Sequence, residues 1–171
     1  EDRDAFTAFV SYAAYALNIL GYQVSVALAP KYSDSQQGIL YEGIDYGGLG
    51  AAANWVVLMT YEWGYTYGPP MAVAPINQVR RVVQYAVTKI PPDKICLGVP
   101  NYGYDWPLPY VRGATKARTL GNVEAVQTAV FYGVPILFDE TAKSPYFQYW
   151  QYGVKHEVWF EDVRSWQAKF T

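Results

Sequence analysis

Residues 54–61 read NWVVLMTY, an almost unbroken apolar run that ends at the charged Glu62. Two similar runs lie on either side of it in the sequence, YQVSVALAP at 22–30 and KICLGVP at 94–100. Apolar runs without polar alternation are typical of strands that are buried on both faces of a parallel sheet. We therefore predict three parallel strands, one in each of these segments.

Helical patterns separate the predicted strands. Apolar residues recur at helical spacing over 4–20 and 74–90, and a shorter, glycine-containing helix fits 46–53. Val24, Val56 and Ile95, one in each predicted strand, are 32 and 39 residues apart. This spacing is the size of a repeated strand–helix unit. The predicted fold class is therefore α/β.

The pattern changes after residue 100. The stretch 101–118 is polar and contains Pro and Gly, and a helical pattern follows near 121–132. Three short runs at 134–140, 146–152 and 155–160 then predict a small antiparallel β insertion, with a tight hairpin at Gly153-Val154. Glu161 or Asp162 is expected to cap a final helix.

Composition excludes several classes of protein. The chain has 171 residues, a length typical of one domain, and 51% of them are hydrophobic, which is enough for a core. Thirteen Lys and Arg against fifteen Asp and Glu, without a basic cluster, exclude a nucleic-acid binder. No apolar run is long enough for a membrane span. Cys96 is the single cysteine, so a disulfide within the chain and a cysteine-based metal site are excluded, and we interpret Cys96 as buried filler. We expect no metal and no cofactor.

The aromatic content, with 17 Tyr and 6 Trp, favours a sugar-binding surface. Ligands of parallel α/β folds bind at the carboxyl ends of the strands, so the residues after each apolar run are candidates for the site. The residues expected on this rim are Ala29, Pro30, Lys31 and Tyr32 after the first run, Met59, Tyr61, Glu62 and Trp63 after the second, and Asn101, Tyr102, Tyr104, Asp105 and Trp106 after the third. Six of them are the candidate site residues: Met59, Tyr61, Glu62, Trp63, Asn101 and Tyr102. Simpler interpretations make Glu62 a solvated loop acid, Asp105 a turn residue and His156 a strand residue without a ligand.

The segments MTYEWGYTYGPP (59–70) and LGVPNYGYDW (97–106) resemble glycoside hydrolase family 18, the chitinase-like barrels, and within it the bacterial spore-germination and cell-wall branch. MTYE (59–62) is similar to the family's Met-x-Tyr-Asp at the end of the sixth strand, with Glu in place of Asp. GVPNYG (98–103) is similar to the end of the seventh strand. The resemblance implies one domain over 1–171, a partial (β/α)8 TIM barrel with about strands 5–7 and their flanking helices, plus the antiparallel insertion at about 101–160.

The resemblance also implies a function, which is substrate-assisted, retaining hydrolysis of glycans that contain N-acetylglucosamine, such as peptidoglycan of the spore cortex or chitin. Tyr61 and Glu62 would be catalytic, and Met59, Trp63, Asn101 and Tyr102 would bind substrate. The family motif DxxDxDxE, whose last Glu is the general acid, is absent from these 171 residues. We therefore expect the chain alone to be inactive. By resemblance its location would be extracellular, in the cell wall or in the spore coat or cortex.

Other functions stay open at this point. A non-catalytic glycan-binding module would keep the aromatic residues without the acid, and an interaction domain would use them only as core and interface. The expected partner is a polysaccharide or oligosaccharide, with no nucleic acid and no membrane. Because a partial barrel leaves strand edges uncovered, self-association is also expected.

Overall fold

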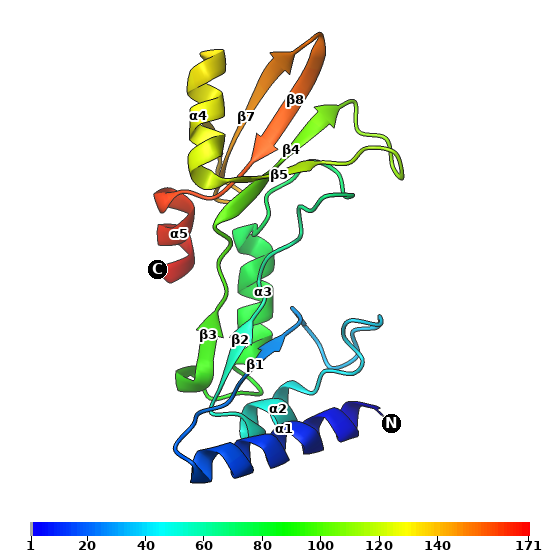
Figure 1. The fold of residues 1–171 in the computed structure, drawn as a ribbon, viewed down its shortest axis with the longest axis vertical. Coiled ribbons are helices and arrows are strands. Elements are labelled where there is room, and N and C mark those ends of the chain that lie inside the picture. The colour runs from blue at the N-terminus through cyan, green and yellow to red at the C-terminus, as the bar shows by residue number, and fades with distance from the viewer. Residues whose placement is uncertain (1) are drawn as a thin grey trace. The chain divides into compact units, whose positions relative to one another are not determined.

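The computed structural model describes residues 2–171, and the chain divides into two compact units (Figure 1). The first unit runs to Thr60 and includes Arg80–Gly98. The second holds Tyr61–Val79 and Val99–Thr171. The predicted site residues are divided accordingly, since Met59 belongs to the first unit and the other five to the second.

The first unit contains a three-stranded parallel sheet in the order β1-β2-β3. Its strands are β1 (Ser25–Leu28), β2 (Trp55–Leu58) and β3 (Ile95–Leu97). Val56 pairs with Val26 on one side and with Ile95 on the other. The three parallel strands predicted from the apolar runs are thus confirmed. Because the strands run in one direction, their carboxyl ends share one edge of the sheet.

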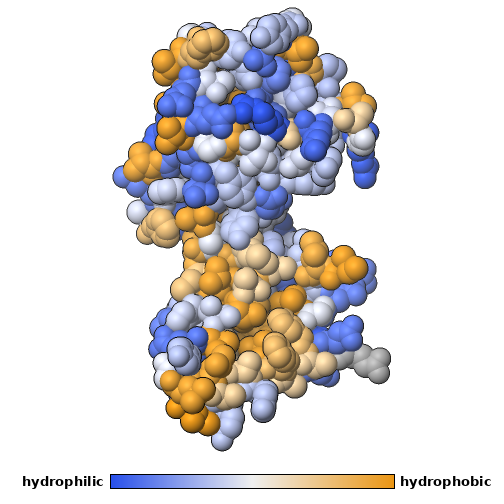
Figure 2. All heavy atoms as spheres, viewed as in Figure 1, coloured by the Kyte–Doolittle hydropathy of each residue, from blue (hydrophilic) through white to orange (hydrophobic). Residues whose placement is uncertain are grey.

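Helices α1 (Asp2–Ile19) and α2 (Tyr46–Ala52) pack beside each other, and α3 (Ile76–Ala86) precedes a short 3-10 turn, η1 (Pro92–Lys94). Val10 and Ala14 of α1 are buried, but its other side exposes large side chains: Phe9, Tyr12, Tyr15 and Ile19. Hydrophobic residues gather on the surface in the part of Figure 2 where Figure 1 draws α1 and α2. None of the helices between residues 2 and 171 has both the length and the apolar character of a membrane span.

The prediction that Cys96 is buried is wrong, because its side chain is exposed. Alternation along β3 places Cys96 on the face of the sheet opposite to Ile95 and Leu97. Its partner on β2 is Val57, which is only half-buried, whereas Val56 on the other face of β2 is fully buried. The apolar run therefore marks a strand with one well-covered face, not two.

The second unit is built on a five-stranded antiparallel sheet in the order β5-β4-β8-β7-β6. Its strands are β4 (Tyr102–Leu108), β5 (Arg118–Gly121), β6 (Leu137–Asp139), β7 (Ser144–Gln151) and β8 (Val154–Trp159). Helix α4 (Asn122–Tyr132) lies along one face of this sheet, and α5 (Val163–Phe170) follows β8 (Figure 1). The antiparallel strands predicted at 134–140, 146–152 and 155–160 are confirmed, but the sheet has two more strands, because the polar stretch after residue 100 contains β4 and the start of β5.

Alternation along β4 divides the sheet into two differently covered faces. Tyr104 and Trp106 pack in one cluster with Val73 and Ala117. Asp105, between them, points to the opposite face and lies beside Val158 of β8. That face carries a second cluster, in which α4 packs on the sheet: Leu120, Ala125, Ala129, Phe147, Tyr149, Val158 and Phe160. One strand therefore presents aromatic side chains to one face and a carboxylate to the other.

Local turn and cap chemistry fixes the end of the chain. Strands β7 and β8 are joined by Tyr152 and Gly153, both with positive φ (49° and 78°), as a two-residue type I′ hairpin requires. The turn therefore lies at Tyr152-Gly153, one residue before the predicted Gly153-Val154. Of the two predicted caps, Asp162 is the one used. Its carboxylate accepts hydrogen bonds from the backbone N–H groups of Arg164 and Ser165. In return, the Ser165 hydroxyl oxygen accepts a hydrogen bond from the Asp162 backbone N–H.

Gly103 of β4 is the glycine for which the sheet leaves no room. A Cβ at this position would lie 2.2 Å from the Trp159 carbonyl oxygen and 2.6 Å from Phe160 Cβ. We expect Gly103→Ala to lower the free energy of unfolding by about 1–3 kcal/mol, since the strands must separate to admit the methyl group. Urea unfolding measures the loss. The control is Gly121→Ala, where a Cβ meets nothing within 4 Å, and equal losses in the two variants would contradict this account.

Candidate active site

Two tyrosines of β4 hold the carboxylate of Glu62. The Tyr102 hydroxyl donates to Glu62 Oε1 at 2.5 Å, and the Tyr104 hydroxyl donates to the same oxygen at 2.9 Å. The other oxygen, Oε2, takes no hydrogen bond from residues 2–171, and Glu62 as a whole is exposed. One half of the carboxylate is thus fixed by the protein, and the other half is open to a ligand.

The loop after β2 determines the direction of Glu62. The loop closes on itself, because the Trp63 N–H donates to the Val73 carbonyl at 3.1 Å and the Gly64 N–H to the Ala72 carbonyl at 2.9 Å. A Cβ at Gly64 would lie 2.2 Å from the Met71 carbonyl oxygen, so only glycine allows this approach. Glu62 itself has φ 70°, in the left-handed region, which costs a residue with a side chain about 1–2 kcal/mol. Such conformations gather at functional sites, where the surrounding structure holds them.

The two tyrosines keep their protons over a wide pH range. Burial raises the pKa of Tyr102 above its ordinary value, and the hydrogen bond to the Glu62 carboxylate raises this pKa further. Burial and Glu62 raise the pKa of Tyr104 in the same way. Both phenols therefore act as donors to Glu62 whenever that carboxylate is charged. The interpretation of Glu62 as an ordinary solvated acid accounts for its exposure but not for these two bonds.

The other predicted site residues lie at different places. Tyr61 is half-buried and packs against the cluster that contains Tyr104. Trp63 is half-buried in the loop after Glu62, and Asn101 is exposed just before β4 without a hydrogen bond to Glu62. Met59 follows β2 in the first unit, is half-buried, and donates its backbone N–H to the Leu28 carbonyl at 3.0 Å. The second unit thus brings Tyr61, Glu62 and Tyr102 together.

Tyr104 and Asp105 are expected on the rim but are not among the candidate site residues. Tyr104 is the second donor to Glu62, which the alternation Tyr-x-Tyr-x-Trp over 102–106 indicates once β4 is recognised as a strand. Asp105 instead pairs with His156. Asp105 is not a turn residue but lies buried within β4, with its Oδ1 2.8 Å from His156 Nδ1. Among residues 2–171, no group of three or more His, Cys, Asp or Glu side chains could hold a metal ion.

The sequence model of glycosyl hydrolases family 18 matches residues 1–171. The chain belongs to glycosyl hydrolase family 18. Its family 18 relatives include the cortical fragment-lytic enzyme of Bacillus subtilis, which is 48% identical over 99% of this chain and 40% of that protein. This family 18 chain therefore spans about two fifths of the length of the curated relatives that it matches. The family and the spore-germination branch expected from 59–70 and 97–106 are confirmed.

Solved structures place the chain in the same family. The spore cortex-lytic enzyme SleL of Bacillus megaterium superposes with a TM-score of 0.93 at 48% identity, over 99% of this chain and 39% of that one. A chitinase from Chromobacterium violaceum superposes with a TM-score of 0.88 at 29% identity, over 96% of this chain and 50% of that one. The relatives thus include proteins named for the spore cortex and proteins named for chitin.

Proposed function

We propose that this chain contributes the second half of a glycosidase barrel, about strands 5–7 of a (β/α)8 fold with an antiparallel insertion at about 101–160. Its proposed role is to hold an N-acetylglucosamine residue of a glycan during substrate-assisted, retaining hydrolysis. The observation that carries this proposal is the half-open carboxylate of Glu62, fixed by Tyr102 and Tyr104. Membership of a glycosidase family supports it.

The proposed mechanism gives each residue a task. In substrate-assisted hydrolysis the N-acetyl oxygen of the substrate attacks the anomeric carbon while a carboxylic acid protonates the leaving oxygen. Tyr61 would donate to the acetamido oxygen, where charge develops, and Glu62 Oε2 would accept from an acetamido N–H or a hydroxyl. Such bonds accelerate the reaction because they strengthen in the transition state. Trp63, Asn101, Tyr102 and Met59 would contact the sugar.

Peptidoglycan of the spore cortex or cell wall is the substrate class that we favour, and chitin is the alternative. The name of the Bacillus subtilis relative supports the first and that of the Chromobacterium violaceum relative the second. A cortex substrate would place the protein outside the cell or in the spore.

We also propose that the exposed apolar side chains on α1 support self-association, and a monodisperse monomer in sedimentation velocity would contradict this.

Substitutions at Tyr61 and Glu62 test the site. We expect Glu62→Gln to weaken binding of chitotetraose by about tenfold, because hydrogen bonds to charged groups contribute about 1.5–3 kcal/mol. Tyr61→Phe should weaken binding less, since its bond forms mainly in the transition state. Isothermal titration calorimetry measures both. The control is Glu140→Gln, an exposed acid paired with Lys143. Unchanged binding in both site variants would favour the interaction-domain alternative.

A non-catalytic glycan-binding module is the second candidate. Such a module would hold a sugar through Glu62 and the aromatic residues without a general acid. The gene sequence upstream of the codon for Glu1 distinguishes the two candidates. An in-frame DxxDxDxE motif would support the glycosidase, and its absence would support the binding module.

A further inference from the structure

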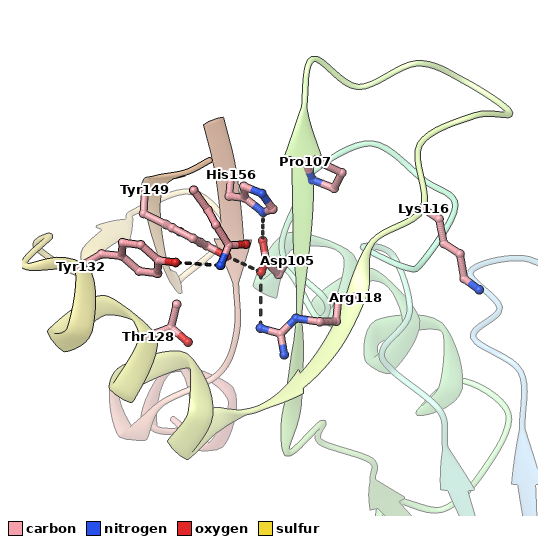
Figure 3. A pocket seen from close by; sticks show the side chains of 9 residues that line it. Asp105, Pro107, Lys116, Arg118, Thr128, Tyr132, Tyr149 and His156 are labelled. Atoms are coloured by element: carbon pink, nitrogen blue, oxygen red, sulfur yellow. Dashed lines mark hydrogen bonds and ion pairs between the residues drawn. The ribbon is translucent and has the colours of Figure 1, made fainter. Parts of the chain in front are cut away.

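A second polar pocket lies on the face of β4 opposite to Glu62. Its volume is about 360 Å³, and β4, β7, β8, α4 and the segment that enters β5 surround it (Figure 3). Asp105 points into it, whereas Tyr102 and Tyr104 point to the other face of the strand. The pocket is therefore separate from the Glu62 site, and the proposed mechanism does not use it.

Asp105 organises this pocket. Its carboxylate is 3% exposed and accepts the Tyr149 hydroxyl at 2.7 Å on Oδ2. Arg118 Nη2 lies 3.5 Å from the same oxygen, and His156 Nδ1 lies 2.8 Å from Oδ1 (Figure 3). Because an ionised carboxylate only accepts hydrogen bonds, the proton of this bond is on His156 Nδ1. Both oxygens of Asp105 thus already have partners within the protein.

Ring stacking holds the pocket wall in place. The Tyr149 ring lies between two others, with its centroid 4.8 Å from that of His156 and 4.4 Å from that of Tyr132. The Tyr132 hydroxyl accepts a hydrogen bond from Gln151 Nε2 at 2.8 Å, which leaves the Tyr132 proton to be donated elsewhere. The wall is therefore built before any ligand binds, which reduces the entropy lost on binding.

The groups that the pocket still offers are mostly donors. Arg118 is 54% exposed, and it uses one nitrogen on Asp105 and another on Glu124 of α4. Lys116 also lines the pocket, with its Nζ 6.0 Å from the centre of the Tyr67 ring. The lining thus carries an arginine and a lysine, and the two carboxylates near Arg118, those of Asp105 and Glu124, are both paired with it. Such a pocket suits a ligand rich in acceptors and carrying negative charge, and arginine is the side chain that best fits a carboxylate.

We propose that this pocket binds a carboxylate group attached to a glycan. Peptidoglycan carries carboxylates on its peptides and on those lactyl ethers that bear no peptide, whereas chitin carries none, so an occupied pocket would favour an acidic glycan. The pocket is argued from its own geometry, and only the choice of a glycan carrier rests on the proposed function. It would hold a part of the polymer on the face of the sheet that does not carry Glu62.

The test uses probes that differ only in charge or carrier. The chain is titrated with N-acetylmuramic acid, with its neutral methyl ester, and with N-acetyl-D-alanine, and the backbone amides are followed by NMR. We expect the acid to bind at millimolar concentration and to shift the amides of Arg118 and His156, and the ester to bind at least fivefold more weakly. N-acetyl-D-alanine binding as tightly as the acid would indicate a peptide carboxylate, and weaker binding a sugar-linked one. Equal binding of acid and ester, or no shift at these amides, would overturn the proposal.

A matched pair of arginine variants adds a second test. Arg118→Gln should weaken binding of the acid about tenfold. Arg164→Gln, at a similarly exposed arginine that pairs with Asp162, should leave binding unchanged. Thermal unfolding of both variants shows whether the sheet is intact. Because the comparison of acid with ester uses the unmodified chain, it decides the question even where Arg118→Gln fails to fold.

If Glu62→Gln weakens chitotetraose binding and the acid does not bind, the proposed function stands and the pocket proposal fails. If the acid binds and Glu62→Gln leaves chitotetraose binding unchanged, the pocket proposal stands and the proposed function fails.

Discussion

Lys169→Met should lower the free energy of unfolding of the second unit by about 3–5 kcal/mol, which is the usual cost of leaving one partner of a buried ion pair alone. Lys169 Nζ donates to Glu161 Oε2 at 2.7 Å, and the side chains of both residues have no exposed surface. The partners of Glu161 tie α5 to the sheet and to α4, since its backbone N–H donates to Asn122 Oδ1 at 3.2 Å. Without Lys169, a buried carboxylate loses its main compensation. Urea unfolding followed by tryptophan fluorescence measures the loss.

The loss should also depend on pH. Burial raises the pKa of Glu161 in the folded chain, and Lys169 opposes that rise. In the variant this pKa rises further, so the folded state binds a proton at pH values where the unfolded state does not. The variant is therefore penalised least below the ordinary value of 4.5 and increasingly as the pH rises above it. A penalty that is the same at acidic and neutral pH would contradict an unpaired Glu161.

Two comparisons isolate the ion pair. Lys143→Met removes a lysine whose partner Glu140 is exposed, so it should change the free energy of unfolding by less than about 1 kcal/mol. The double variant Glu161→Leu with Lys169→Met replaces both charges by apolar groups, and it should recover most of the loss. If the double variant is as unstable as Lys169→Met alone, packing of the lysine stem rather than its charge carries the effect.

The second large expected effect concerns catalysis. We expect the 171-residue chain to release N-acetylglucosamine from chitotetraose or cortex fragments at a rate lower by about 10²–10⁴ than a form that carries a general acid, since this is the usual contribution of a positioned acid. The proposed site would orient an acetamido group, but the 171 residues contain no DxxDxDxE motif to protonate the leaving oxygen. Chromatography of the reducing ends measures release, with the Bacillus subtilis cortical fragment-lytic enzyme as the positive control.

A substrate that needs no acid sharpens this test. Dinitrophenol leaves as a stable anion, so the chain should be impaired much less on dinitrophenyl chitobioside than on chitotetraose. Equal impairment on both substrates would show that more than the acid is missing and would favour the binding module. Release from chitotetraose at the rate of the positive control would refute the expectation of inactivity.

The parallel part of the fold was predictable because burial alone determines it. The run NWVVLMTY (54–61) holds five consecutive apolar residues, 55–59, so a central parallel strand is the simplest structure for it. Strand β4 is different, since YGYDWPL (102–108) contains Gly, Asp and Pro, which usually indicate a turn. These residues are acceptable in a sheet only because Gly103 meets the Trp159 backbone and Asp105 meets His156, contacts with residues more than 50 positions away.

The same limit applies to the candidate site. The place of Tyr61 and Glu62 after β2 follows from the rule that ligands bind at the carboxyl ends of parallel strands. The hydrogen bond from Tyr104 to Glu62 does not follow from this rule, because it depends on which face of β4 each tyrosine occupies. Asp105 was misassigned for a related reason, since nothing local to it in the sequence shows that Tyr149, His156 and Arg118 converge on its carboxylate.

The alternation of β4 also limits how this chain can be re-engineered. Inserting one residue between Tyr102 and Asp105 would rotate everything beyond it by half a turn about the strand, so the carboxylate and the aromatic rings would exchange sides. Two residues inserted together would restore the orientation and only lengthen the strand. Loop grafts in this region should therefore add or remove an even number of residues within β4.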